Sequence, residues 1–231
     1  MIPFKNDVPT RRKPFVTVGL IAINCLVFIY QVSLPEKETL DLIYLFGAVP
    51  AVVTHFPAWG LTGTNHPALT LVSSMFLHGG LIHLLGNMLY LWIFGNNVED
   101  SMGHLRFIVF YLACGLIAAA AQVFNAPHSE IPMIGASGAI SGVLGAYLVI
   151  HPFARVHTLI FIFIFIRVVT LPAIIVLGIW FLLQIMSSLY IAPDAAGVAW
   201  MAHIGGFIAG MILISFFQKS HRRRFRKNSI F

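Results

Sequence analysis

The sequence predicts an all-α membrane protein, built as a bundle of six transmembrane helices with a long interfacial loop between the first two. Hydrophobic residues make up 58% of the 231 residues, and charged residues only 10%. A soluble domain carries about 25% charged residues, so this chain has too few charges to cover a water-exposed surface. The mean hydropathy of +0.88 agrees with a membrane protein.

Six apolar runs predict the six helices. They occupy residues 15–33, 79–97, 105–124, 135–151, 171–190 and 200–217. Most approach the roughly 20 apolar residues that a helix needs to cross the hydrocarbon core. A basic stretch precedes the first run, as in a signal peptide, but the run is too long and no small-residue cleavage site follows it, so we expect it to be retained. The fourth run is short and rich in Gly and Ala, which is typical of a helix packed closely by its neighbours.

Two further segments do not fit as transmembrane helices. The long connection between the first two runs mixes chain breakers such as Pro50 and Pro67 with aromatic residues such as Trp59. This composition predicts an interfacial loop whose short helices lie at the level of the lipid headgroups. The other segment, 158–166, alternates Leu, Ile and Phe. It is too short to cross a membrane, and we place it in the connection between the fourth and fifth helices.

The basic residues orient the helices. Six spans place both termini on one side together with three loop arginines, so that 13 of the 14 Lys and Arg residues share that side and only Lys37 lies opposite. By the positive-inside rule this side is the cytoplasm. We therefore expect a basic cytoplasmic arm (1–14), a six-span domain (15–217) and a basic cytoplasmic tail (218–231), in the plasma (inner) membrane of a bacterium. The tail follows an apolar run, so we interpret its charge as a membrane anchor and not as a nucleic-acid site.

The fourth run opens with a candidate nucleophile. Ser137 stands in Gly135-Ala136-Ser137-Gly138 at the start of the helix, where free backbone N–H groups and the helix dipole favour negative charge. By itself such a motif is more often a small-residue packing surface or an N-cap. Ser141 repeats the pattern one turn deeper, but its amide is already bonded within the helix, so we prefer Ser137.

His203 opens the sixth run and is the candidate general base. Ionisable residues in a transmembrane helix often mark function, and neutral imidazole is the usual proton acceptor for a serine. A histidine bonded to an interfacial carbonyl is the alternative. Gly206 and Gly210 form a Gly-x-x-x-Gly face that would let this helix approach one carrying Ser137, although the same spacing is equally typical of homodimerisation.

The second run supplies hydrogen-bond donors. His83 and Asn87 are four residues apart, so they share a helix face, and two neutral donors there could stabilise the oxyanion of a tetrahedral intermediate. The rival interpretation is a metal site formed by His78, His83 and His203. No Cys or carboxylate joins these three imidazoles, so we expect no metal.

These motifs resemble the rhomboid family of intramembrane serine proteases in their order, spacing and helix assignment. The three motifs are His78-x4-His83-x3-Asn87, Gly135-Ala136-Ser137-Gly138 and Ala202-His203-Ile204-Gly205-Gly206-x3-Gly210. The resemblance extends over nearly all of residues 15–217. It implies a Ser137–His203 dyad without an acid, in which Ser137 attacks a peptide carbonyl and His203 accepts its proton.

The resemblance also implies the supporting groups and the substrate. The Ser137 amide, His83 and Asn87 would hold the oxyanion, with Gly135 and His78 in support. No metal or organic cofactor is implied. The substrates would be single-span transmembrane proteins, cut near their extracytoplasmic end within the lipid bilayer.

This chain departs from the family pattern at one position and matches it at another. An aromatic residue often stands four positions after the nucleophile in this family, whereas this chain has Ser141 there. Glu99 matches a family position that we take as structural, since it lies on the cytoplasmic side.

Substrate access is expected between helices, at the fifth helix and the loop 191–198. A transporter or a helix-binding chaperone on the same six-span scaffold is the alternative function.

Overall fold

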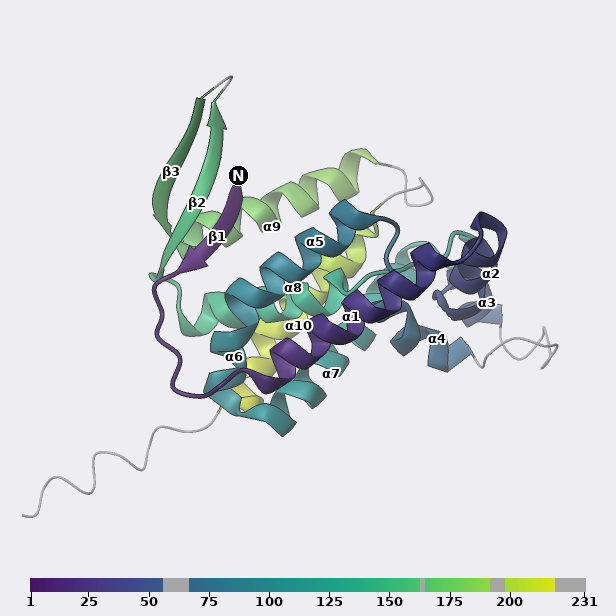
Figure 1. Ribbon diagram of the computed structural model, residues 1–231, viewed down its shortest axis with the longest axis horizontal. Coiled ribbons are helices and arrows are strands. Elements are labelled where there is room, and N and C mark those ends of the chain that lie inside the picture. The colour runs from purple at the N-terminus through teal and green to yellow at the C-terminus, as the bar shows by residue number, and fades with distance from the viewer. Residues whose placement is uncertain (56–66, 163–164, 192–197, 219–231) are drawn as a thin grey trace, which may run out of the picture.

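The computed structural model describes residues 1–55, 67–162, 165–191 and 198–218. It shows a bundle of helices with a small β-sheet at one end (Figure 1). The longer helices are α1 (Phe15–Ser33), α7 (His104–Asn125), α8 (Ser137–Ile150), α9 (Ala173–Tyr190) and α10 (Trp200–Phe217). One further rod runs from α5 (Leu81–Tyr90) through a π-helical turn, η2 (Leu91–Gly95), into α6 (Asn96–Met102). A helix thus lies in each of the six apolar runs, whereas the predicted tail beyond Gln218 is outside the described residues.

Length and hydropathy identify the helices that can cross a membrane. Within the described ranges, α1, α7, α9 and α10 are long and apolar enough. The pair Pro67–Phe76 and Leu81–Met102 is bent by 84° and makes a fifth if it is counted as one span. α8 has only 14 residues, which extend about 21 Å at 1.5 Å per residue, short of the roughly 30 Å hydrocarbon core. The protein is therefore a mostly helical integral membrane protein with four to five spans by length alone.

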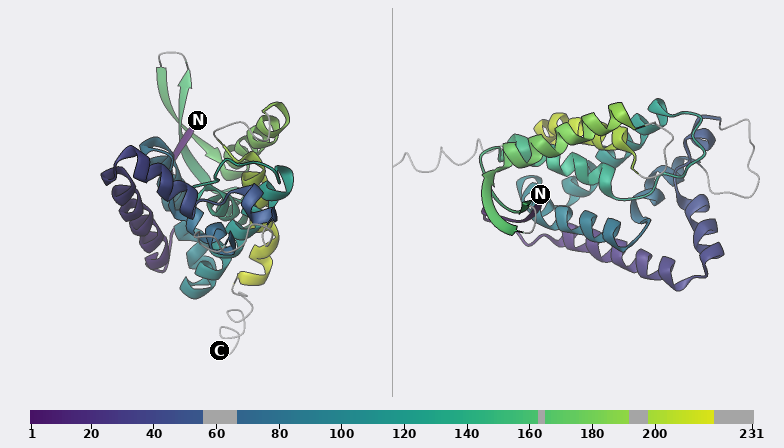
Figure 2. Two further views of the ribbon diagram at one scale, coloured as in Figure 1. Left: turned by 90° about the vertical axis from the view of Figure 1, so that its right-hand side faces the viewer. Right: turned by 90° about the horizontal axis from the view of Figure 1, so that it is seen from above.

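α8 lies inside the bundle, and its small residues let two neighbours approach. Every residue from Ala139 to Tyr147 is buried, and α7 and α10 pack along it. Figure 2 shows the bundle from two further sides, with the helices packed around one another in both views. A helix enclosed in this way has no need of the length or the lipid-facing surface that an outer span requires.

The crossing of α8 and α10 is close enough for the two backbones to touch. A Cβ atom added at Gly206 would overlap the carbonyl oxygen of Gly138, and one added at Gly210 would overlap that of Gly142. The Gly-x-x-x-Gly face of α10 is therefore covered by α8 of the same chain. A homodimer, the alternative considered from the sequence, has no room on this face.

The prediction of an all-α fold is wrong at one end of the bundle. There β2 (Arg155–Ile162) and β3 (Phe165–Pro172) pair antiparallel, and β1 (Ile2–Asn6) adds to the other edge of β2. The segment 158–166 is thus largely strand where it is described. Its alternation of Leu, Ile and Phe is the period-two pattern of a strand, and the β-branched residues of both strands favour an extended backbone. The run is too short for a transmembrane helix, and pairing satisfies its backbone groups.

The N-terminal arm is held against this end of the bundle. The His157 ring donates a hydrogen bond of 2.8 Å to the Asp7 carboxylate, which lowers the pKa of that carboxyl. The backbone N–H groups of Arg11 and Arg12 donate to the carboxylate of Asp100 at 3.1 and 3.0 Å. The arm therefore runs along β2 and α6 instead of extending freely.

Short helices occupy the connection that follows α1. Where it is described, the connection consists of α2 (Glu36–Phe46), α3 (Pro50–His55), α4 (Pro67–Ser73) and a 3₁₀ turn, η1 (Ser74–Phe76). Residues 56–66, which include Trp59, lie outside the described ranges. Figures 1 and 2 show these short helices at the end of the bundle opposite the sheet. Their location at the lipid headgroups stays a prediction.

Glu99 is buried beside the first turn of α1. Its carboxylate accepts hydrogen bonds from the backbone N–H groups of Val16 and Thr17, at 3.0 and 2.8 Å, and from the Thr17 hydroxyl at 2.6 Å. The His104 ring lies 2.6 Å from the same carboxylate. A carboxylate here satisfies free N–H groups at a helix N-terminus and complements the helix dipole. Glu99 thereby ties α1 to α6.

Candidate active site

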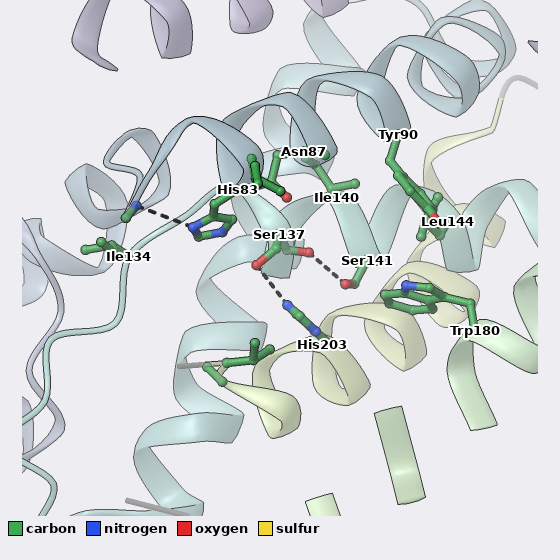
Figure 3. A pocket seen from close by; sticks show the side chains of 15 residues that line it. His83, Asn87, Tyr90, Ile134, Ser137, Ile140, Ser141, Leu144, Trp180 and His203 are labelled. Carbon is green, nitrogen blue, oxygen red and sulfur yellow. Dashed lines mark hydrogen bonds between the residues drawn. The ribbon is translucent and has the colours of Figure 1, made fainter. Parts of the chain in front are cut away.

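Ser137 and His203 meet in a cavity inside the bundle (Figure 3). Ser137 begins α8, and His203 lies in the first turn of α10, so the close crossing of these helices brings the two side chains together. The Ser137 Oγ atom is 2.8 Å from His203 Nε2. This is the separation of a nucleophile and its general base. Both residues are half-buried and line a cavity of about 600 Å³.

Ser141, the competing serine, is placed differently. Its Oγ donates a hydrogen bond of 2.7 Å to the backbone carbonyl of Ser137, and the residue is only 1% exposed. The hydroxyl proton is therefore committed to the helix backbone, one turn along α8 from the Ser137 side chain. The structure places Ser137, and not Ser141, opposite His203.

Gln184 of α9, which sequence reasoning missed, joins Ser137 and His203 in a row of three hydrogen-bonded side chains. Its Oε1 atom lies 2.7 Å from His203 Nδ1, and the residue is buried. The rings of Trp180 and Trp200 flank the imidazole, with centroids 5.9 and 6.2 Å from it. The sequence signal for Gln184 is a single amide in an otherwise apolar run, the same kind of contrast that distinguishes His203.

The cavity is lined by both polar and apolar side chains. The polar side chains that line it are His83, Asn87, Tyr90, Ser137, Ser141 and His203. None of its described lining residues is Asp, Glu, Lys or Arg. Trp180 of α9 and Val198 line the same space, on the side where we expect access between helices, while residues 192–197 of the adjoining loop are outside the described ranges.

His83 and Asn87 face the backbone that leads into Ser137. Gly135 has a φ of +121°, and a Cβ there would lie 2.8 Å from His83 Nε2 and 3.6 Å from Asn87 Nδ2. Glycine is therefore needed both for its conformation and for its size. The backbone N–H of Gly79 donates to His83 Nδ1 at 3.4 Å, so the neutral His83 ring carries its proton on Nε2, the atom nearer Gly135.

His78 supports this arrangement from behind. Its Nε2 atom lies 2.9 Å from the Asn87 side-chain nitrogen, and it is 2% exposed. Gln31 of α1 holds the backbone of His78, because its Oε1 accepts from the His78 N–H at 3.0 Å and its Nε2 donates to the carbonyl at 3.3 Å. Gln31 is a second buried amide that sequence reasoning missed.

The three imidazoles of the metal interpretation do not converge. Across the described part of the chain, no group of three or more His, Cys, Asp or Glu side chains is placed to hold a metal ion. The His78 and His83 rings do contact each other, with centroids 5.0 Å apart. Both ring nitrogens of His203, however, have other partners, Ser137 and Gln184.

Comparison with known proteins gives a consistent family. A family model described as the Rhomboid domain matches residues 65–220, more than half of the chain. The rhomboid protease GluP of Bacillus subtilis is 30% identical over 145 residues, which cover 63% of this chain and 25% of that protein. The mitochondrial presenilin-associated rhomboid-like protein A of Danio rerio is 30% identical over 207 residues, which cover 86% of this chain and 46% of the relative.

A mammalian protein is similar over the same extent. Rhomboid-related protein 2 of Mus musculus is 28% identical over 203 residues, or 86% of this chain and 62% of its own length. This chain therefore spans between 25% and 62% of these three relatives. Because one relative is bacterial and another is named as mitochondrial, the bacterial inner membrane stays a prediction. The match of the domain model over most of the chain shows that this protein belongs to the rhomboid family.

Proposed function

We propose that the protein is an intramembrane serine endopeptidase that cleaves single-span transmembrane proteins near their extracytoplasmic end. The observation that carries the proposal is the distance of 2.8 Å between Ser137 Oγ and His203 Nε2. A serine and a neutral imidazole at this distance form an activated nucleophile. The surrounding cavity of about 600 Å³ provides space for a peptide segment beside them.

The reaction follows from the contacts of the two side chains. Ser137 Oγ attacks the substrate carbonyl while His203 Nε2 takes its proton, and the imidazolium then gives that proton to the leaving amine. Water hydrolyses the acyl-enzyme in a second step of the same kind. Neither of these two steps requires a metal or an organic cofactor.

Three N–H donors are available for the oxyanion. The backbone N–H of Ser137 is at the N-terminus of α8, where it has no partner within the helix. His83 Nε2–H and the Asn87 amide approach from α5 on the side of Gly135. Donors held in place before the reaction stabilise a charge that develops only in the transition state, which is the role we assign to this group.

The position of the cavity suits a substrate that is itself a helix. Hydrolysis requires water, so polar groups at this depth must line a space that water can enter. A transmembrane helix has its carbonyls bonded internally and must unwind before one can reach Ser137. Small or helix-breaking residues near the outer end of the substrate lower the cost of unwinding.

The proposed arrangement in the membrane has more spans than the four or five that length and hydropathy identify. The helices in the six apolar runs cross the bilayer as one domain (15–217), with α8 shielded by its neighbours. The arm (1–14), the sheet and the basic tail (218–231) lie on the cytoplasmic side, and the short helices after α1 lie at the opposite headgroups. This places 13 of the 14 basic residues on one side, as the positive-inside rule requires.

Cysteine labelling from each side of sealed vesicles checks the orientation. We expect Thr10→Cys and Gln218→Cys to react with a membrane-impermeant maleimide from the cytoplasmic side, and Lys37→Cys from the other. The unmodified chain is the control, because Cys25 and Cys114 lie within α1 and α7. Labelling of Thr10→Cys and Gln218→Cys from opposite sides would show an odd number of spans and contradict the arrangement.

Reaction with a fluorophosphonate tests the proposed activity. The probe phosphonylates an activated serine, so we expect mass spectrometry to find the adduct on Ser137, and we expect His203→Ala to abolish labelling. A transporter or a helix-binding chaperone, the alternative considered from the sequence, has no reason to react. An adduct on Ser141, or none on either serine, would contradict the proposed dyad.

A further inference from the structure

We propose that Gln184 is a positioning residue that selects the catalytic tautomer of His203. This inference rests on the proposed protease function. Its elements are three side chains in a row, from Gln184 of α9 through His203 of α10 to Ser137 of α8, joined at 2.7 and 2.8 Å. None of these three side chains is a carboxylate, so Gln184 must act on the ring through a neutral hydrogen bond.

A second contact determines which way the Gln184 amide faces. Its Nε2 atom donates to the backbone carbonyl of Trp180 at 3.2 Å, one turn back along α9. A carbonyl oxygen only accepts hydrogen bonds, so the amide nitrogen must be the atom that points to it. Oε1 is thereby directed toward α10 and His203.

The direction of the amide determines the protonation of the ring. Gln184 Oε1 only accepts, so His203 Nδ1 must carry the proton that bridges the 2.7 Å between them. Neutral imidazole has one N–H, which leaves an unprotonated Nε2 facing the Ser137 hydroxyl. The other tautomer would set two lone pairs against each other at Nδ1 and would present Nε2–H to Ser137, where a base is needed.

The surroundings of His203 explain why an amide serves here. Gln184 is 7% exposed and lies in a helix that is apolar enough to span a membrane, where a carboxylate would be costly to bury. Ser141 of α8 lines the same cavity as His203, and its side chain is too small to stack on an imidazole. Trp180 and Trp200 provide packing, but neither ring offers an acceptor to Nδ1. Among the described residues, Gln184 is the acceptor that distinguishes the tautomers.

Two substitutions and a matched control test this role. Gln184→Leu removes the acceptor with little change in size, and we expect kcat for a single-span substrate to fall at least about 10-fold with KM nearly unchanged, because the wrong tautomer disables a serine–histidine pair. Gln184→Glu restores an acceptor, so kcat should recover. The acid limb of its pH–rate profile should move to higher pH, because a carboxylate favours imidazolium. Gln122→Leu makes the same change at another buried glutamine, in α7, and should behave as the parent.

Nitrogen-15 NMR of the histidine rings measures the tautomer directly. We expect the proton of neutral His203 on Nδ1 in the parent and Gln122→Leu proteins, and a mixture of both tautomers in Gln184→Leu. Parental kcat and an unchanged tautomer in Gln184→Leu would overturn the inference. Equal losses of kcat in the Leu and Glu variants with the tautomer unchanged would also overturn it, because they would indicate a packing role.

The design separates this inference from the proposed function. If Ser137→Ala cleaves substrate as well as the parent, the protease assignment fails, but the NMR measurement still shows whether Gln184 sets the His203 tautomer. If Ser137→Ala is inactive and Gln184→Leu retains the parental kcat and pH profile, the protease assignment stands and the role of Gln184 is wrong.

Discussion

Ser137→Ala is expected to reduce cleavage of a single-span substrate to background, a loss on the order of 10⁴- to 10⁶-fold in kcat. The variant keeps His203 and the three proposed oxyanion donors, but it has no oxygen to attack the substrate carbonyl. Removal of the Ser137 hydroxyl leaves α8 intact, because Ser137 Oγ contacts His203 rather than the helix backbone. Purified protein in liposomes, with the product followed by gel electrophoresis over time, provides the measurement.

Ser141→Ala is the matched control for this loss. It deletes the same atom one turn away, where the hydroxyl bonds to the Ser137 carbonyl, a contact worth about 1 kcal/mol of folding free energy. We expect its kcat to stay within a few-fold of the parent. Parental cleavage by Ser137→Ala would refute the assignment of the nucleophile, and an inactive Ser141→Ala beside an active Ser137→Ala would transfer that role to Ser141.

The residues that the sequence identifies are those whose chemistry contrasts with an apolar run. Ser137 and His203 stand out because polar and ionisable side chains are costly in a membrane helix and often mark function there. The predicted helix directions and the rise per residue put both near the same membrane face, as a prediction from the sequence. The glycine face and the family resemblance predict their contact, which the structure shows at 2.8 Å. Which glycines of α8 and α10 meet could not be predicted, because no spacing within one helix specifies that pairing.

The roles of two buried amides, Gln31 and Gln184, could not be predicted from the sequence either. Gln31 bonds to the backbone of His78, and Gln184 bonds to the ring of His203. Each partner lies in a different helix or in a turn, so neither pair has a recognisable sequence spacing. An isolated amide in an apolar run was visible, but its role depends on a neighbour that only the tertiary structure supplies.

The sheet was missed for a related reason. Its alternating pattern in 158–166 was noted, yet β2 becomes a strand by pairing with β3 and with β1 from the other end of the chain. The partner β1 (Ile2–Asn6) is short and carries Pro3 and Lys5, so its sequence alone predicts no strand. Strand formation here is decided by the partner and not by propensity.

Gly206→Val is expected to separate α8 from α10 and so to lose both stability and activity. A Cβ at this position already overlaps the carbonyl oxygen of Gly138, and backbone atoms cannot rotate away as a side chain can. Overpacking of a close contact costs about 1–3 kcal/mol of unfolding free energy, which lowers the thermal midpoint by roughly 2–4 °C for each kcal/mol. A shift of about 1 Å between the helices would also cost about 100-fold in kcat, because Ser137 and His203 lie on either side of this contact.

The matched control is Gly19→Val, because a Cβ at Gly19 in α1 meets no atom within 4 Å. It makes the same change in helix propensity without a steric conflict, so its thermal midpoint in detergent and its kcat should stay close to those of the parent. Parental values in Gly206→Val would mean that the α8–α10 contact does not set the dyad. A change in oligomeric state alone would indicate that this glycine face forms a dimer interface. A joint fall in stability and kcat is expected only if the glycines hold Ser137 and His203 together within one chain.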